Sequence, residues 1–594
     1  MSDATSNANT IDAPTPEKGI AAAEAKNNPV LAADGTPLKK SLRRALRAQK
    51  LRALMLIAPL LIFVLVTFIA PILDMLFRSI ENQIVSDTLP RTTSQLSEWD
   101  PATDELPPEA VYEAFYYDLF AAVEARQHTR LGQRLNYENT GVSSLFRGSG
   151  RDLDDFREDQ VEYIEDFSPE WEDAGYWLSL MSGEGGEDFL DTRRDAILAL
   201  IRESKRSPLG DLWCATIATC ATAPEDIDIG YTPSAEVIDL LPRTSEAYAD
   251  FALITVLEEE DSIAEEEPWE AVYVALAQDL AETPESELAA FSGPQAQALV
   301  DLKAGLADVE AQSFRDLFAQ SDDDWVTPSP WRTIQTYAPA YTTGYFLNAA
   351  DMQKTPDGPE FRPENERIYG LLLQRTMFLS LTITFSCILL GYPIAYLLSN
   401  LPMRTANLLM ILVLLPFWTS LLVRTSAWKV MLQQQGVIND VLVWLGLVGD
   451  GSRLVMINNQ FGTIVAMTHI LLPFMILPMY SVMSTIPPSY VRAAKSLGAT
   501  NWTTFWRVYF PQSVPGIGAG SILVFILSIG YYITPEIVGG TTGTFISNRI
   551  AYHISSSLNW GLAAALGSIL LVVVLALYWA YDRIVGIDNV KLGG

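Results

Sequence analysis

Residues 489–515 read SYVRAAKSLGATNWTTFWRVYFPQSVP and join two long apolar segments of the chain. Tyr490, Ala493 or Ala494, and Leu497 share one face of a short helix, because residues three or four apart are neighbours on a helix surface. Gly498 can adopt the left-handed conformation that commonly ends a helix. The first half of this stretch therefore predicts a short helix followed by a tight turn.

The second half of the stretch predicts another helix. Thr500 or Asn501 can cap its N-terminus through a side-chain oxygen. Aromatic residues then recur at helical spacing, at positions Trp502, Phe505, Trp506 and Tyr509, and Pro511 and Pro515 precede the next apolar segment. The small residues of the first helix allow another surface to approach closely, and the aromatic residues can anchor the element. An ordinary amphipathic connector would show the same periodicity.

Six apolar stretches are long enough to cross a membrane, which takes about 20 residues. They are Ala53–Leu73, Thr376–Met403, Thr405–Val423, Leu454–Val491, Val508–Pro535 and Ile554–Tyr581. A seventh run, Val437–Val448, is too short to span and contains Asp440, so we expect an interfacial or re-entrant helix.

The distribution of basic residues predicts the orientation of these spans. Seven Lys and Arg residues precede the first span between positions 39 and 52, and Arg583 and Lys591 follow the last. Both termini are therefore expected in the cytoplasm. The loops at Arg404 and at residues 492–507 then fall on the same side, and the segment after the first span lies outside.

That outer segment is strongly acidic. Residues 81–370 hold 60 of the 71 acidic residues of the chain but only 19 of its 40 basic residues. The segment is also rich in aromatic residues, and its stretches 110–126 and 285–319 have apolar residues at helical spacing. We expect a mainly α-helical extracytoplasmic domain, with turns at residues 107–108 and 183–186. Its charge fits either attraction of a cationic partner or simple solubility.

Possible metal and disulfide sites in this segment are few. The acidic runs at 258–261 and 322–324 lack the spacing of a calcium loop, so we interpret them as solvated helix ends and predict no metal site. Cys214 and Cys220 are either joined by a disulfide bond or remain as two free thiols. Cys387 lies inside a span and is expected to be a small core residue.

These observations divide the chain into four parts. They are a basic, disordered tail (residues 1–50), a first transmembrane helix (51–80), the acidic periplasmic domain (81–368), and transmembrane helices two to six (369–594) with the connecting loop at 489–511. We therefore predict an all-α membrane protein with a mainly helical insertion between its first and second spans.

The connecting loop resembles the EAA loop of ABC importer permeases, a coupling helix that docks on the ATPase subunit. The matching positions are Ala493, Ala494, Gly498, Ala499, Phe505 and Pro511. Arg492 occupies the position of the glutamate in that pattern, so a contact made by that carboxylate does not carry over.

Two further stretches are similar to signatures of the spermidine/putrescine-type permeases: LPFWTSLLVRTSAW at 415–428 and SIGYYITPEIVGG at 528–540. Their polar and aromatic side chains are candidates for the transport pathway, although packing or interface roles remain open. These candidates are Trp418, Arg424, Tyr531, Tyr532 and Glu536. His469 is expected to make a hydrogen bond between helices.

The resemblance implies type I importer architecture with six spans in a bacterial inner membrane. The chain would pair with a second, homologous permease subunit, two ATPase subunits and a periplasmic solute-binding protein, and it would not bind nucleic acid. It has no G-x-x-x-x-G-K-[ST] motif, so it is expected to be no enzyme and to leave ATP and magnesium to the ATPase. A polyamine or similar small organic cation is the expected solute. The alternative is a membrane-anchored sensor whose acidic external domain binds a ligand.

Overall fold

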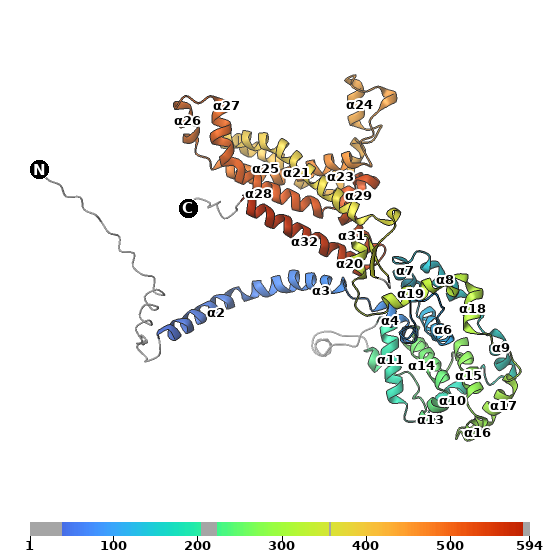
Figure 1. Ribbon diagram of the computed structural model, residues 1–594. Coiled ribbons are helices and arrows are strands. Elements are labelled where there is room, and N and C mark those ends of the chain that lie inside the picture. Colours follow the sequence, from blue (N-terminus) through green and yellow to red (C-terminus); the bar gives the residue numbers. More distant parts are fainter. Residues whose placement is uncertain (1–37, 203–222, 356–357, 586–594) are drawn as a thin grey trace. The chain divides into compact units, whose positions relative to one another are not determined.

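The computed structural model describes residues 38–202, 223–355 and 358–585 (Figure 1). The chain divides into two units, residues 1–77 and residues 78–594. Cys214, Cys220 and Lys591 lie outside the described residues, as does the expected disordered tail up to residue 37.

The described part of the first unit is a run of helix. α2 (Leu38–Val64) continues through the π-helical turn η1 (Leu65–Ile69) into α3 (Ala70–Arg78). Residues 54–78 of this run are long and apolar enough to cross a membrane. Assigning residues 38–50 to a disordered tail was wrong, because the helix already begins at Leu38. The Leu, Arg, Ala and Lys residues of this stretch are strong helix formers.

Helices also make up most of the acidic segment. They are α4 (Ile84–Thr88), α5 (Pro90–Leu96), α6 (Glu109–Glu124), α7 (His128–Asn136), α8 (Val142–Asp152), α9 (Glu158–Phe167), α10 (Ala174–Met181), α11 (Glu187–Ile201), η2 (Pro224–Asp226), α13 (Ala235–Leu240), α14 (Pro242–Leu257), α15 (Glu270–Glu282), α16 (Glu285–Leu288), α17 (Ala296–Leu306), α18 (Phe314–Ser321), η3 (Asp323–Val326), α19 (Pro328–Tyr337) and α20 (Gly344–Ala349). A hairpin of β1 (Met352–Thr355) and β2 (Gly358–Phe361) and the turn η4 (Glu364–Glu366) follow.

The sequence pattern located some of these helices better than others. Residues 110–126 and 285–319 both show helical spacing of apolar residues; the first stretch coincides with the single helix α6, and the second divides into the three short helices α16, α17 and α18. The acidic run at 258–261 follows the end of α14, and Asp322 caps η3 by accepting a hydrogen bond from the Asp324 N–H at 3.0 Å. Both runs therefore lie at helix ends, as expected.

The start of the acidic segment lies beside residues 340–342. The Asn82 N–H donates to the Ala340 carbonyl at 2.8 Å, and the Thr342 N–H donates to the Ile80 carbonyl at 2.8 Å. A domain inserted into a loop needs its ends close together, because the host chain must enter and leave at one place. Residues 80–342 meet that condition.

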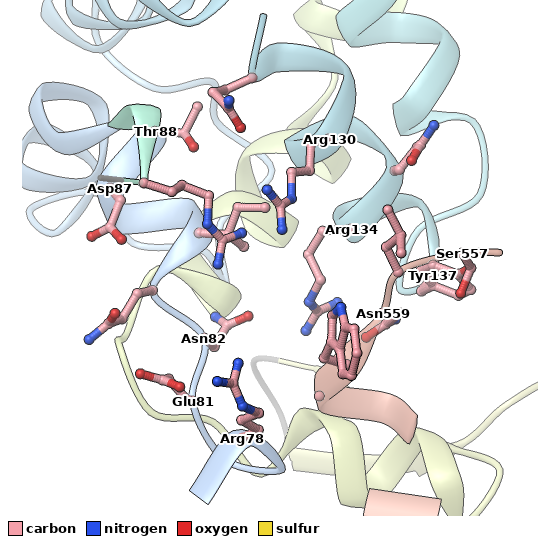
Figure 2. Close-up of a pocket in the computed structure, with 18 of the residues that line it drawn as sticks. Arg78, Glu81, Asn82, Asp87, Thr88, Arg130, Arg134, Tyr137, Ser557 and Asn559 are labelled. Carbon is pink, nitrogen blue, oxygen red and sulfur yellow. The ribbon is translucent and has the colours of Figure 1, made fainter. Parts of the chain in front are cut away.

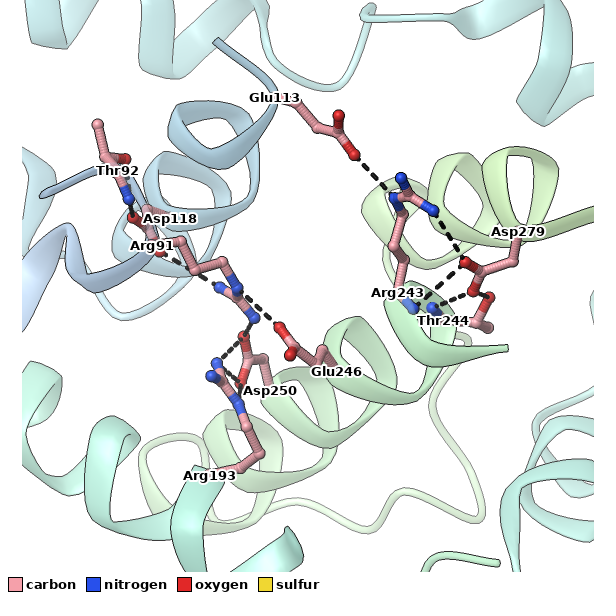
Figure 3. A network of polar contacts seen from close by, with 10 residues as sticks. All are labelled: Arg91, Thr92, Glu113, Asp118, Arg193, Arg243, Thr244, Glu246, Asp250 and Asp279. Carbon is pink, nitrogen blue, oxygen red and sulfur yellow. Dashed lines mark hydrogen bonds and ion pairs between the residues drawn. The ribbon is translucent and has the colours of Figure 1, made fainter. Parts of the chain in front are cut away.

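A sequence motif occurs twice in this segment. LPRT stands at 89–92 and again at 241–244, and EAVY stands at 109–112 and again at 270–273. In the first copy the backbone N–H and hydroxyl of Thr92 donate to Asp118 at 2.7 and 2.8 Å (Figure 3). In the second copy Thr244 makes the same two bonds to Asp279, both at 2.8 Å. The segment thus contains two copies of one structural motif.

The two copies are joined by hydrogen bonds in which the tyrosine of each EAVY donates to the backbone carbonyl of a buried tryptophan that follows the other EAVY. Trp177 donates to the Trp171 carbonyl at 2.7 Å, and Trp331 donates to the Trp325 carbonyl at 2.9 Å. The hydroxyl of Tyr273, from the second EAVY, donates to the same Trp171 carbonyl at 2.8 Å, whereas that of Tyr112, from the first EAVY, donates to the Trp325 carbonyl at 2.9 Å. The first motif therefore packs against the last part of the segment, which closes the domain on itself.

The remaining helices form the membrane block. They are α21 (Tyr369–Asn400), α22 (Met403–Leu414), η5 (Leu415–Trp418), α23 (Leu421–Met431), α24 (Val437–Trp444), η6 (Asp450–Ser452), α25 (Gln460–Ser484), α26 (Pro488–Ser496), α27 (Asn501–Thr504), the π-helical η7 (Phe505–Tyr509), α28 (Phe510–Gly530), α29 (Ile533–Val538), α30 (Gly540–Gly543), α31 (Ile546–Ser555) and α32 (Trp560–Val585).

Within the described residues of the whole chain, five helices are long and apolar enough to span a membrane, or six if one bent pair counts as a span. That pair covers residues 403–418 and 421–431 and bends by 92°. The stretch 405–423, predicted as a span, is therefore not one straight helix but is broken near its end. The helix breaks where Thr419 and Ser420 adopt extended backbone after Pro416, and the Ser420 side chain caps the helix that follows. The last span begins at Trp560 rather than Ile554.

Helix α25 packs against both α21 and α28 in the core of this block. Gly516 and Gly520 of α28 face α25 so closely that an added Cβ at Gly520 would lie 2.7 Å from the Met475 sulfur. Small residues permit such close approach between membrane helices. Cys387 of α21 is fully buried in the same core, as expected.

Candidate functional site

The loop at 489–511 forms the predicted helix–turn–helix. α26 ends before Gly498, whose φ of +87° lies in the left-handed region. The Thr500 side chain then caps α27 by accepting a hydrogen bond from the Thr503 N–H at 3.2 Å. Both the glycine turn and the cap are confirmed, and Thr500 rather than Asn501 is the cap.

No described residue of α26 is buried. Arg492 and Ala493 are exposed, Ala494 and Ala499 are half-buried, and Leu497 is 89% exposed. An exposed leucine at the end of a short helix with small neighbours is an apolar surface that no described residue of this chain covers. The helix therefore presents a surface that another protein can cover.

The aromatic residues after the turn anchor the loop to the membrane block. The Phe505 ring contacts the rings of Tyr392 and Tyr396 on α21, with centroids 6.1 and 5.9 Å apart. The Tyr509 hydroxyl lies 3.1 Å from the Ser399 hydroxyl. Pro511 is exposed at the start of α28. Anchoring was predicted for the aromatic residues as a group, but Trp502 remains 71% exposed.

The two signature stretches come together in space. α23 packs against α29, and the hydroxyls of Thr425 and Thr534 lie 3.1 Å apart between them. Trp418, Tyr532 and Glu536 are exposed, whereas Tyr531 packs partly against the core. The pathway candidates thus occupy neighbouring elements.

Arg424 lies on α23, in the first of these stretches. The Nε and Nη1 atoms of its guanidinium are buried and have no hydrogen-bond partner among the residues that the structure describes. One turn later, Trp428 donates from Nε1 to Nδ1 of His469 at 3.1 Å. His469 therefore makes the expected bond between helices and is half-buried.

Asn548 is a residue that the sequence did not reveal. From α31 its amide nitrogen donates to the Tyr532 carbonyl at 2.9 Å and to the Glu536 carboxylate at 2.6 Å. Its side-chain oxygen accepts a hydrogen bond from the Phe545 N–H at 3.0 Å. Asn548 therefore fixes the position of Glu536, and no local motif marks it.

The short helix α24 confirms that residues 437–448 do not form a full span. Asp440 pairs with Arg453 at 2.7 Å, and Trp444 is 83% exposed.

No group of metal-binding side chains occurs in the described ranges 38–202, 223–355 and 358–585.

Comparison with known proteins agrees with this architecture. The family described as binding-protein-dependent transport system inner membrane component matches residues 387–585. The spermidine/putrescine transport system permease protein PotB of Salmonella typhimurium (strain SL1344) is 33% identical over 220 residues, which cover 36% of this chain and 76% of PotB. The chain belongs to the spermidine/putrescine-type family of ABC importer permeases.

A second relative is the inner membrane ABC transporter permease protein YdcU of Escherichia coli (strain K12), 32% identical over 38% of this chain and 74% of YdcU. Among solved structures, a bacterial alginate ABC transporter in complex with an alginate-bound periplasmic protein matches with a TM-score of 0.31 and 20% identity, covering 38% of this chain and 81% of that one. A likeness this loose says nothing about the cargo.

As a permease of this family, the chain is a multi-pass membrane protein and a transport subunit rather than an enzyme. The alternative, a membrane-anchored sensor, has no support from these relatives. The family match begins at residue 387, so the acidic segment lies outside it.

Proposed function

We propose that this permease imports a polyamine or a similar small organic cation. PotB, named as a spermidine/putrescine permease, supplies the main support. The exposed carboxylate of Glu536 beside the exposed ring of Tyr532, with Trp418 also exposed, suits a cation, because carboxylates pair with ammonium groups and aromatic faces attract them.

Uptake of spermidine by the reconstituted transporter tests the cargo. Glu536→Gln should reduce uptake at low spermidine concentration and raise KM, because the carboxylate would attract the cation. Glu366→Gln, which changes an acid outside the two signature stretches, should leave KM unchanged. A wild-type transporter that takes up no spermidine and is not inhibited by it would contradict the proposal.

We further propose that α26 is the coupling helix, docking on one ATPase subunit of a dimer that binds ATP and magnesium. The exposed surface of α26 and the fixed turn at Gly498 support this role. A second permease subunit would complete the pathway, and the unpaired buried nitrogens of Arg424 favour an acidic group on such a partner. A periplasmic solute-binding protein would deliver the cargo.

The topology is also a proposal: both termini cytoplasmic and the acidic segment periplasmic, in a bacterial inner membrane. In a cysteine-free background, Asp323→Cys should react with an impermeant thiol reagent on intact cells, and Asn501→Cys should not. Both positions are exposed, so accessibility within the fold does not bias the comparison. The reverse labelling pattern would overturn the topology and the coupling role together.

A further inference from the structure

A polar cavity of about 550 Å³ lies where the acidic segment meets the start of α32 (Figure 2). α4, α7 and α11 contribute one part of its wall, and residues 557–561 contribute another. The charged residues on the wall are Arg78, Glu81, Asp87, Arg130, Arg134 and Arg202. Arginines outnumber acids here, although acids outnumber bases about threefold in residues 81–370.

Arg134 is 7% exposed and is held in a fixed position. Its Nε donates to the Tyr345 hydroxyl at 2.9 Å, and its Nη1 donates to the Glu138 carboxylate at 2.9 Å. Its Nη2 has no hydrogen-bond partner among the described residues. A buried, unpaired N–H of a guanidinium is costly, so a ligand that accepts a hydrogen bond from it would be favoured.

Arg130 lies one helical turn before Arg134 on α7, and both side chains extend into the cavity (Figure 2). No ion pair of Arg130 or Arg202 occurs in the part of the chain that the structure describes. Burial, and then the positive charge of Arg202, lower the pKa of Arg130. The two guanidiniums therefore repel each other, and an anion between them would relieve the repulsion.

The N-terminus of α32 reaches the same cavity. Asn559 is 8% exposed and caps this helix, its side-chain oxygen accepting from the Leu562 N–H at 3.1 Å. The Asn559 amide nitrogen is buried and has no partner among the described residues. Trp560 and Gly561, the first residues of this 26-residue helix, also line the cavity. The positive end of a helix dipole favours a negative charge.

We propose that this cavity binds a small oxyanion, a carboxylate or a phosphate, held by Arg130, Arg134, Arg202 and Asn559. The bound anion joins the acidic segment to the outer end of the last transmembrane helix, because its contacts come from both. This site is separate from the transport pathway, because its lining includes none of the pathway candidates Trp418, Arg424, Tyr531, Tyr532 and Glu536. The proposal does not depend on the identity of the cargo.

Calorimetry on the full-length permease in detergent tests the site, with citrate and inorganic phosphate as probes at matched ionic strength. We expect saturable binding of at least one probe, and the one that binds identifies the class of oxyanion. Spermidine should not compete with the bound probe. Absence of binding by both probes at millimolar concentration overturns the proposal.

Arg130→Gln and Arg202→Gln should each weaken binding about tenfold or more, because each removes a charged hydrogen-bond donor. Arg151→Gln, an exposed arginine on α8 outside the cavity, is the matched control and should bind as wild type. Asn559→Asp keeps the helix cap and places a negative charge in the cavity, so it should weaken oxyanion binding without disturbing the fold. Unchanged affinity in all three cavity variants overturns the site.

Discussion

The turn between α26 and α27 depends on one residue, Gly498. Its φ is +87°, and an added Cβ would meet no atom within 4 Å. Only backbone strain therefore opposes a side chain here, at a cost of about 1–2 kcal/mol. Gly498→Val should reduce ATP-dependent uptake and copurification of the ATPase, whereas Gly498→Asn should retain both, because asparagine tolerates the left-handed conformation.

This pair of variants separates conformation from size. Both asparagine and valine would extend into open space, so a clash within the chain does not distinguish them. Full uptake and full ATPase copurification in Gly498→Val would show that the turn does not position a coupling surface.

A second residue, Glu124 at the end of α6, makes stability depend on pH. Burial, followed by the negative charges of Asp154, Glu259 and Glu270, raises its pKa from 4.5 to about 7. Between these values the unfolded chain releases the proton while the folded chain retains it, so stability falls as pH rises from about 4.5 to 7 and is then constant. Glu124→Gln should raise Tm at pH 8 and have little effect at pH 4.5.

Thermal unfolding of both proteins across this pH range measures the difference. Glu158→Gln, an exposed acid at the start of α9, is the control and should shift Tm much less. A gain for Glu124→Gln that is equal at pH 4.5 and pH 8 would contradict the assignment.

At this scale the sequence predicted residues whose roles are local. Gly498 and Thr500 act on their own turn, so residue type and spacing were sufficient. Arg134 was missed because its partner Tyr345 lies 211 positions away. Asn548 was missed because its partners Tyr532 and Glu536 belong to other elements, 16 and 12 positions away, and neither missed residue belongs to a motif. The hydropathy pattern indicates which segments are buried, but it does not indicate which side chains from distant parts of the sequence form hydrogen bonds.

Among the elements, the contact of α28 with α25 depends on glycine. An added Cβ at Gly520 would lie 2.7 Å from the Met475 sulfur and 3.1 Å from its carbonyl oxygen. Because the carbonyl belongs to the backbone of α25, the two helices would have to separate. Gly520→Ala should destabilise the membrane block by about 1–3 kcal/mol, the usual cost of overpacking.

The same substitution at Gly530 is the control, since no atom lies within 4 Å of an added Cβ there. Alanine also favours helix over glycine, so Gly530→Ala should be neutral or slightly stabilising. Thermal unfolding in detergent measures both. Equal Tm values for the two variants would show that α25 and α28 are not in close contact.

Hydropathy found the positions of the elements but not their breaks. Residues 405–423 are uncharged and mostly apolar, yet the chain turns by 92° between 418 and 421, because Pro416 and the capping Ser420 set the backbone locally. Apolar composition says that a segment is buried in lipid or protein, and says little about where its helix ends.

In the whole molecule, the acidic segment is organised by its repeated motif. The repeats LPRT and EAVY are visible in the sequence, so the two copies were predictable from self-similarity. Their crossed pairing was not, because it depends on which copy each tyrosine meets. Tyr112 bonds the carbonyl of Trp325, 213 positions away, and this contact makes the first and last parts of the segment neighbours.

This closure predicts that residues 79–342 fold alone. Every residue of the largest hydrophobic core lies between Val85 and Tyr337, and the paired backbone at residues 80–82 and 340–342 brings both cut ends together. The isolated segment should be soluble, largely helical by circular dichroism, and should melt in one cooperative transition. A broad, non-cooperative thermal transition of the isolated segment would show that its core needs the membrane block to fold.

The charge of the same fragment gives the sign of its salt dependence. Residues 79–342 contain 55 acidic and 16 basic side chains, an excess of 39 acids, so like charges repel across the folded surface. The screening length falls from about 30 Å at 0.01 M salt to about 8 Å at 0.15 M, which weakens long-range repulsion more than the short, partly buried ion pairs of Arg91 and Arg193 with Asp250. Raising salt over this range should therefore raise the Tm of the isolated segment. A fall in Tm would mean that attractive pairs such as these, rather than net repulsion, dominate its electrostatics.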